Sequence, residues 1–420
     1  MQRPVAQEHF VKIIDQHFSI NDKPYYFVGT NYWYGGLLAI LKDEKRGKER
    51  LIKELDFLKS KGVDNLRILA GSEGAGRING VERVRPVLQE KQGVFDAKIL
   101  EGLDFLLAEM AKRKMYAVLF LSNNWEWSGG FLQYLNWNGK IDLATMQKKL
   151  SWDGLRDETS KFYDCQPCKD DYLKQVDYIL NHVNIYNGKK YTEEPAIMAW
   201  ELANEPRPMR PKAVSSYKKW IADVATHIKS KDSNHLVTIG TEGTQGTEES
   251  IDLWKEIHKN SNVDYTTLHI WPKNWSWFKG DSIKEGLPQV LANTTAYIEQ
   301  HKIAAVEIGK PLVIEEFGLP RDQHDFKAGT PTDYRDELYT VVLDELLNGA
   351  KNKGVVSGLN FWAFGGSSRP IDGQLFWKEG DDFSGDPPQE EQGLNTVFDN
   401  DKSTWKIIKK HTKKIRKIKQ

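Results

Sequence analysis

The sequence of 420 residues contains only two cysteines, Cys165 and Cys168, which form the motif CQPC. A structural zinc site needs four ligands, and no second cysteine pair is present to complete one. The surrounding sequence also lacks the βαβ pattern of a thioredoxin-like redox site. We therefore expect either a local disulfide or two inert thiols at these positions.

Long apolar runs and an excess of one charge are absent as well. No stretch approaches the ~18 apolar residues of a membrane span, so we expect no such span. Lysine plus arginine and aspartate plus glutamate each total 59, a balance that favours neither nucleic acid nor an anionic membrane as a partner. The one basic cluster, KKHTKKIRKIKQ at 409–420, we interpret as the solvated face of a last helix rather than a polyanion site.

The first ten residues, MQRPVAQEHF, contain no apolar signal region. We expect residues 1–8 to be disordered or foreign to the natural chain. The protein itself we expect to be secreted, or held at the cell surface or in the periplasm, with its leader absent from this sequence.

Aromatic residues, by contrast, are abundant, with 14 Trp, 16 Tyr and 17 Phe. Many of the tryptophans fall in polar, loop-like stretches such as NNWEWSGG, YLNWNG and WPKNWSWF. Tryptophan in such places is unusual for packing alone. Flat aromatic faces stack on sugar rings or nucleobases, and the balanced charge favours sugar.

Strand-like and helix-like segments alternate along the whole chain. The apolar patterns predict eight strands, at 25–31, 63–69, 115–121, 196–204, 235–241, 264–270, 311–318 and 355–364. Helical patterns lie near 49–61, 98–113, 170–183, 213–230, 249–259, 283–303 and 333–349. This alternation predicts an α/β fold, a (β/α)8 TIM barrel with long βα loops that forms a single catalytic domain over residues 1–420. An N-terminal hairpin turning at Asn21-Asp22 is expected to cover the barrel bottom.

Two of the predicted strands end in glutamate, which is where a barrel places its catalytic groups. WELANEP ends the fourth strand with Glu205 before Pro206, and PLVIEEFG ends the seventh with Glu315 and Glu316. Adjacent strand residues point to opposite faces, so we expect only Glu316, nearer the strand end, to enter the barrel mouth. Glu201, earlier in the fourth strand, we expect to be a buried structural acid.

Two carboxylates at a barrel mouth among loop aromatics fit the hydrolysis of a glycosidic bond. One gives its proton to the leaving oxygen while the other attacks the anomeric carbon. A separation of about 5–5.5 Å gives retention and ~6.5–9.5 Å gives inversion, and the sequence does not specify this distance. The alternative is two independent buried acids in salt bridges.

The order and spacing of four motifs resemble glycoside hydrolase family 5 of clan A, in particular its β-1,4-mannanase subgroup. The motifs are GTNYWYGG, WELANEPR, HIWPKNW and NFWAFGG, and the similarity runs from about residue 9 to 410. The resemblance implies a retaining endo-β-1,4-mannanase that acts on mannan, glucomannan or galactomannan by double displacement. It implies Glu205 as acid/base and Glu316 as nucleophile, with no metal and no cofactor. The expected partner is a β-mannan polysaccharide or a manno-oligosaccharide, bound by a monomer.

The resemblance also assigns residues that would bind substrate. Arg67 would hydrogen-bond the nucleophile and keep it ionised, and Asn204 would hold the sugar 2-hydroxyl. His269 would face the acids or the sugar, and Trp362 would floor the −1 subsite. Trp271 departs from the tyrosine that many family members use to contact the nucleophile. Since an indole donates one hydrogen bond and accepts none, we expect Trp271 to stack on a sugar or to donate to a hydroxyl instead.

Further positions are assigned more loosely. Asn124 and Trp125 match a pattern on the glycone side, and Arg207 matches one on the aglycone side. Other subsite candidates are Trp33, Trp127, Trp275 and Trp277. We expect the long loop 122–170 to wall the glycone side of the cleft. The acidic loop 379–393 lacks spaced calcium ligands, so we expect it to be solvated or to form the cleft rim.

Three alternatives remain open from the sequence. An exo-acting β-mannosidase would use the same chemistry, with the long loop blocking the far glycone subsites. A β-1,4-glucanase or cellulase is a weaker option within the family. A non-catalytic carbohydrate-binding barrel would be marked by loss of either acid, and both acids are present.

Overall fold

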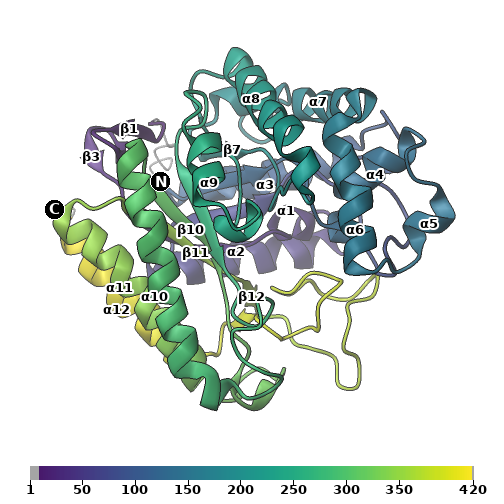
Figure 1. Cartoon of the computed structure of the whole chain (residues 1–420). Coiled ribbons are helices and arrows are strands. Elements are labelled where there is room, and N and C mark those ends of the chain that lie inside the picture. Colours follow the sequence, from purple (N-terminus) through teal and green to yellow (C-terminus); the bar gives the residue numbers. More distant parts are fainter. Residues whose placement is uncertain (1–8, 419–420) are drawn as a thin grey trace.

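The computed structural model describes residues 9–418 and confirms the (β/α)8 barrel (Figure 1). Its wall is a parallel sheet with the strand order β8-β7-β6-β5-β4-β11-β10-β9. The strands are β4 (Phe27–Asn31), β5 (Asn65–Leu69), β6 (Tyr116–Phe120), β7 (Ile197–Glu201), β8 (Leu236–Thr238), β9 (Thr266–Ile270), β10 (Leu312–Phe317) and β11 (Val356–Phe361). The end strands approach each other where the Thr238 hydroxyl donates to the Tyr265 carbonyl at 3.1 Å. Residues 1–8, predicted to be disordered or foreign, lie outside the described residues.

Helices surround the barrel, and each of the seven predicted helical segments coincides with one of them. The outer helices are α2 (Glu44–Lys61), α3 (Ala97–Lys112), α7 (Gln166–Leu180), α8 (Val214–Lys231), α9 (Ile251–His258), α10 (Ile283–Ile308), α11 (Asp333–Asn352) and α12 (Lys402–Ile418). In α2 the apolar stripe of Leu51, Leu55 and Leu58 is buried. The helix ends at Gly62, whose φ of 90° suits glycine and whose N–H bonds the Leu58 carbonyl.

The N-terminal hairpin is confirmed and has one strand more than expected. It consists of β1 (Lys12–Ile14), β2 (His17–Ile20) and β3 (Lys23–Pro24). Both connecting turns, Asp15-Gln16 and Asn21-Asp22, have two residues at positive φ, as two-residue hairpin turns of type I′ require. Phe18 packs with the residues that fill the N-terminal end of the barrel, so the hairpin covers the barrel bottom.

The long segment after β6 is largely helical rather than an irregular loop. It contains η1 (Glu126–Ser128), α4 (Gly130–Trp137), α5 (Leu143–Gln147), α6 (Trp152–Thr159) and η2 (Ser160–Asp164). Cys165 and Cys168 form a disulfide at the start of α7, which decides between the two options left open by the sequence. The remaining short elements are α1 (Gly35–Leu38), η3 (Tyr191–Glu193), η4 (Pro211–Ala213), η5 (Thr244–Gly246), η6 (Asp322–His324), β12 (Phe364–Gly366) and β13 (Val397–Phe398). None of the helices between residues 9 and 418 has the length and apolar character needed to cross a membrane.

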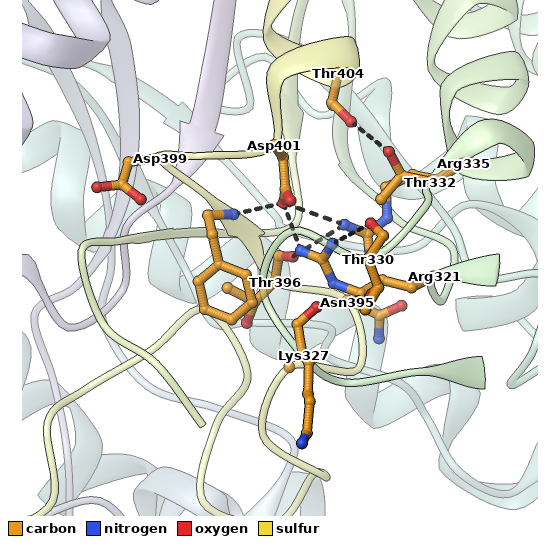
Figure 2. A network of polar contacts seen from close by, with 12 residues as sticks. Arg321, Lys327, Thr330, Thr332, Arg335, Asn395, Thr396, Asp399, Asp401 and Thr404 are labelled. Carbon is orange, nitrogen blue, oxygen red and sulfur yellow. Dashed lines mark hydrogen bonds and ion pairs between the residues drawn. The ribbon is translucent and has the colours of Figure 1, made fainter. Parts of the chain in front are cut away.

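A buried polar network anchors the end of the long segment between β12 and β13 (Figure 2). Arg321 donates to Asp401 Oδ2 at 2.5 Å and to the Thr396 carbonyl at 3.3 Å. Arg335 donates to the same carbonyl at 2.9 Å. Both guanidinium groups are fully buried, so each depends on these acceptors to offset the cost of leaving water. The network therefore fixes the end of segment 367–396, which reaches the cavity described next.

Candidate active site

A cavity of about 560 Å³ lies at the C-terminal ends of the barrel strands. Its walls include six tryptophans: Trp125, Trp127, Trp152, Trp271, Trp275 and Trp362. Glu205 and Glu316 both line it, together with Asn204. The two acids from the fourth and seventh barrel strands thus meet in one cavity, as the strand-end pattern predicted.

A histidine connects the two acids. Nδ1 of His269 lies 2.6 Å from Glu205 Oε1 and 3.3 Å from Glu316 Oε2. One carboxylate oxygen of Glu205 lies within 4.8 Å of one of Glu316. This spacing fits the ~5–5.5 Å of a retaining pair better than the ~6.5–9.5 Å of an inverting pair. Within residues 9–418 this trio is also the one group of His, Cys, Asp and Glu close enough to hold a metal ion.

Glu205 adopts an unusual backbone conformation. Strand β7 ends at Glu201, so Glu205 lies beyond the regular ladder, although its N–H still donates to the Gly240 carbonyl at 3.0 Å. Its φ of 51° is left-handed, which costs a non-glycine residue of order 1–3 kcal/mol and is typical of functional positions. Gly240 permits this path, since a Cβ there would lie 2.2 Å from Glu201 Oε1. The indole N–H of Trp125 donates to Glu205 Oε2 and fixes the carboxylate from the cavity side.

Glu316 is held in its charged form by three neighbours. Arg67 Nη1 donates to Oε1 at 2.5 Å, and the Trp271 indole N–H donates to Oε2 at 3.0 Å. Burial alone would raise the pKa of Glu316, but the nearby His269 and Arg67, with the Trp271 hydrogen bond, lower it below the ordinary value. Burial works against the charged form of His269 too, yet Glu316 and the other carboxylates around the ring raise its pKa well above the usual range. The cavity therefore favours an ionised Glu316 beside a positively charged imidazole.

Arg67 donates hydrogen bonds to other side chains besides Glu316. Its other nitrogens bond both oxygens of Glu201, at 2.8 and 2.5 Å, and the Asn204 side-chain oxygen, at 2.7 Å. Glu201 is fully buried, as expected of a structural acid. Asn204 also donates to Asn123 Oδ1 at 3.1 Å, which fixes the amide beside Glu205.

One expectation, about Trp271, needs correction. The Trp271 indole was expected to donate to a sugar hydroxyl or to stack on a sugar instead of contacting Glu316. Its N–H in fact donates to Glu316. Glu315 and Glu316 were expected to point to opposite faces with only Glu316 in the barrel mouth, and of the two only Glu316 lines the cavity. The register of β10 shifts between Ile314 and Glu316, and Glu315 Oε2 lies 3.7 Å from His269 Nε2 while Glu316 approaches Nδ1 of the same ring.

The cavity lining does not include the predicted substrate residues Arg67, His269, Trp33, Asn124 and Trp277. Trp33 is 1% exposed; its N–H bonds the Gly385 carbonyl at 2.8 Å and its ring packs against Trp127. Asn124 is 2% exposed, and its N–H bonds the Asn204 carbonyl at 2.9 Å. Both side chains are buried and neither lines the cavity, so direct substrate contact by them stays a prediction.

Trp362 and Arg207 do line the cavity. The Trp362 ring meets that of Trp271 edge to face at 5.8 Å, and its N–H has no partner among the described residues. The Arg207 guanidinium lies 5.1 Å from the centre of the Trp125 ring. Trp125 also bonds Glu205, so Trp125 and Arg207 lie together on the Glu205 side of the cavity.

Among the cavity residues that the sequence did not predict, three are charged or aromatic: Glu242, Trp152 and Glu390. Glu242 follows the fifth barrel strand and forms an ion pair with Arg207, with one contact at 2.6 Å. Its position at a strand end was a usable signal. Trp152, on α6, is 52% exposed and stacks on Trp125 at 6.2 Å, and its loop-like context was the only sign.

The third of these residues is Glu390, from the acidic loop 379–393. The loop was expected either to be solvated or to form the cleft rim, and Glu390 places part of it at the cavity. Its Oε2 is buried and has no hydrogen-bond partner in the described residues. Burial and the charges of Asp386, Glu316 and Glu205 raise the pKa of Glu390 well above the ordinary value. The loop carries no pattern that would have marked this one acid among its neighbours.

Comparisons with known proteins agree with this geometry. Residues 8–420 match a family model described as "GH family 5 beta-mannosidase-like". A crystal structure titled as a glycoside hydrolase family 5 mannosidase from Rhizomucor miehei has a TM-score of 0.86 and 31% identity, covering 98% of each chain. An E→A mutant of that enzyme is described in complex with mannosyl-fructose.

Curated relatives carry a related name. "Mannan endo-1,4-beta-mannosidase 4" of Solanum lycopersicum is 28% identical over 372 residues, covering 86% of this chain and 84% of its own. The endo-β-1,4-mannanase of Thermotoga petrophila is 25% identical with a TM-score of 0.68, covering 94% of this chain and 78% of its own. The chain described here is therefore a glycoside hydrolase and belongs to the β-mannosidase-like group of glycoside hydrolase family 5.

Proposed function

We propose that the protein is a retaining endo-β-1,4-mannanase. The observation that carries the proposal is the approach of the Glu205 and Glu316 carboxylates to within 4.8 Å around His269. The names of the relatives, a mannosidase and mannan endo-1,4-β-mannosidases, support mannan as the substrate class. The Cys165–Cys168 disulfide supports an oxidising compartment outside the cytosol as the place of action.

The residues would act in two displacements. Glu205 gives a proton to the glycosidic oxygen while Glu316, kept ionised by Arg67 and Trp271, attacks the anomeric carbon. The shortened sugar chain leaves and a covalent mannosyl ester remains on Glu316. Glu205 then takes a proton from water, which attacks the ester and releases mannose-ended product with the original anomeric configuration.

Two further groups would position the sugar in the −1 subsite. The amide of Asn204 lies between Arg67 and Asn123 and is placed to meet the sugar 2-hydroxyl. Trp362 offers an apolar face and an N–H that is free to donate. On the leaving-group side, Trp125, Trp152 and Arg207 form a stacked surface for the next sugar.

A second candidate, an exo-acting β-mannosidase, is favoured by one specific observation. Pro387, Gln389 and Glu390 close one wall of a cavity of only about 560 Å³. Such a wall would admit a chain end and hinder a chain that must pass through. The mannosidase title of the Rhizomucor miehei structure is in line with this candidate.

The test uses mannohexaose and the parent protein. Mixed oligosaccharides at early times support the endo proposal, whereas mannose with mannopentaose alone supports the exo candidate. NMR of the first product should show the β-anomer, and an α-anomer would contradict the retaining mechanism.

Two amide variants test the assigned roles. Glu316→Gln should abolish turnover of every substrate. Glu205→Gln should slow hydrolysis of mannohexaose by about 10²–10⁴-fold but form the ester readily from a dinitrophenyl mannoside, whose leaving group needs no proton. Glu256→Gln, a surface glutamate paired with Lys218, is the matched control and should leave activity unchanged. Equal loss on both substrates in Glu205→Gln would remove it as the acid.

A further inference from the structure

The C-terminal helix α12 carries a dense and one-sided charge. Between Lys402 and Ile418 it contains eight basic residues and no acidic one, in a protein of zero formal net charge. All eight are exposed: Lys402, Lys406, Lys409, Lys410, Lys413, Lys414, Arg416 and Lys417. The opposite side of the helix is buried against the barrel through Trp405, Ile408 and Ile415, so the position of the basic face is fixed.

None of these eight cations forms an ion pair within residues 9–418, although ion pairs are common on the other helices. The nearest acids before the helix are already engaged, Asp399 with Arg369 and Asp401 with Arg321. On α11, Asp344 bonds His411 instead. Burial lowers the pKa of nearby Lys59, and the charges of Arg416 and Lys114 lower it further against the opposing charge of Asp64.

The arrangement is unfavourable for the helix itself. Five like-charged pairs stand four residues apart on the same face, and each such pair is destabilising. Lys402 lies in the first turn, which has no acidic residue, and a cation there opposes the helix dipole. Only Arg416 and Lys417, in the last turn, interact favourably with it. Solubility alone would be served by both signs interspersed, so a one-sided face calls for a ligand.

The spacing of the charges indicates the shape of that ligand. Lys402, Lys406, Lys409, Lys413 and Arg416 follow steps of four and three residues, so they form one straight row. The row is about 21 Å long, with one cation for roughly each 5.4 Å turn. Lys410, Lys414 and Lys417 form a second row beside it. Figure 1 shows α12 beside α11 on the outer surface, and no residue of α12 lines the catalytic cavity.

We infer that the basic face of α12 is a binding surface for a linear acidic polysaccharide, a polyuronate chain. Such a chain carries one carboxylate per sugar ring, a repeat comparable to the roughly 5.4 Å helical turn that separates the cations. Insertion into a lipid bilayer would need the apolar face of the helix, which is buried. Duplex nucleic acid presents a charge every ~1.7 Å over a wide curved surface, a poor match to one narrow row. The basic cluster that the sequence alone suggested to be merely solvated thus becomes a second site, independent of the proposed catalytic function.

The test measures binding to immobilised polygalacturonate. The test variant combines Lys402→Gln, Lys406→Gln, Lys409→Gln and Lys413→Gln. The control combines Lys148→Gln, Lys149→Gln, Lys212→Gln and Lys284→Gln, which are exposed, unpaired and far from α12 in the chain. Both lower the net charge by the same amount. A third variant places Arg at the four α12 positions and should bind like the parent.

We expect the parent to bind roughly ten- to a hundredfold more weakly at 200 mM than at 50 mM NaCl, because binding releases counterions. The α12 glutamine variant should bind about tenfold or more weakly at 50 mM NaCl, the control should change less than about twofold, and all variants should hydrolyse mannan at the parent rate. Equal weakening in both glutamine variants, no binding by the parent, or equal binding to fully methyl-esterified galacturonate would overturn the inference. Equally tight binding to duplex DNA or phosphatidylserine vesicles would overturn the choice of partner.

Discussion

The substitution Trp271→Phe isolates the contribution of one hydrogen bond to the chemistry. The indole is 8% exposed and donates to Glu316 Oε2 at 3.0 Å. A hydrogen bond to a charged group is worth about 1.5–3 kcal/mol, and one pKa unit corresponds to 1.36 kcal/mol. The phenyl ring cannot donate, so the pKa of Glu316 should rise by about 1–2 units.

The sign of the effect on rate follows from the role of Glu316. The carboxylate attacks only when ionised, and the bond from Trp271 lowers its pKa, so activity persists to lower pH in the parent. In Trp271→Phe the acid limb of the kcat/KM profile should move to higher pH by about 1–2 units. Trp271→Tyr, which restores a donor, should move it less.

The assay is kcat/KM on mannotetraose from about pH 3 to pH 7, since this ratio reports the groups of the free enzyme. Trp275→Phe is the matched control, because its indole lines the same cavity and bonds neither acid. An unmoved acid limb in Trp271→Phe would refute the reasoning. So would an equal movement in Trp275→Phe, which would indicate a general loss of cavity shape.

Three further predictions rest on other parts of the structure. Arg67→Lys loses the fork that holds Glu316 and should lower kcat/KM on mannotetraose by about 10²-fold, and a rate within about threefold of the parent would contradict the assigned role. Asp401→Asn leaves the buried Arg321 without its counter-charge and should cost about 3–5 kcal/mol in the free energy of unfolding, measured by urea denaturation, with little change in KM. Glu390→Gln should be more stable than the parent near neutral pH, by about 1.4 kcal/mol for each unit by which the pKa is raised. Because that pKa is raised, the gain should begin above about pH 4.5 and vanish below it, and a pH-independent difference in melting temperature would be inconsistent with a shifted pKa.

Much of the fold could be predicted because each local signal agreed with the global architecture. Eight apolar strand patterns alternate with amphipathic helical patterns, and each of the seven predicted helical segments is a helix in the structure. The strand-end rule located Glu205 and Glu316 without any knowledge of distance. Glu201, earlier in the fourth strand, was expected to be a buried acid, but the sequence did not indicate that Arg67 would be its hydrogen-bond partner.

The remainder depends on contacts that no local pattern encodes. The bulge at Glu315 breaks the two-residue period by one position, and a single extra residue leaves no trace in composition. Trp33 was expected to be a subsite candidate, but its indole N–H bonds the carbonyl of Gly385, more than three hundred residues later in the chain. Glu390 lines the cavity on a segment whose far end is held by a network around Arg321 and Thr396, a contact between distant parts of the chain.

The pairing of β4 with β11 joins the beginning of the barrel to its end, with Phe27 opposite Gly358. Such a long loop closes only when nearly the whole chain has been synthesised, and its closure is entropically costly. Arg67 and Glu316 lie on the strands that flank this seam, so their ion pair forms only after it closes. A nascent chain that stops before Phe361 would leave β4 with an unpaired edge, open to other chains. The ion pair at the catalytic cavity thus requires β5, near the start of the barrel, and β10, near its end, to be in place together.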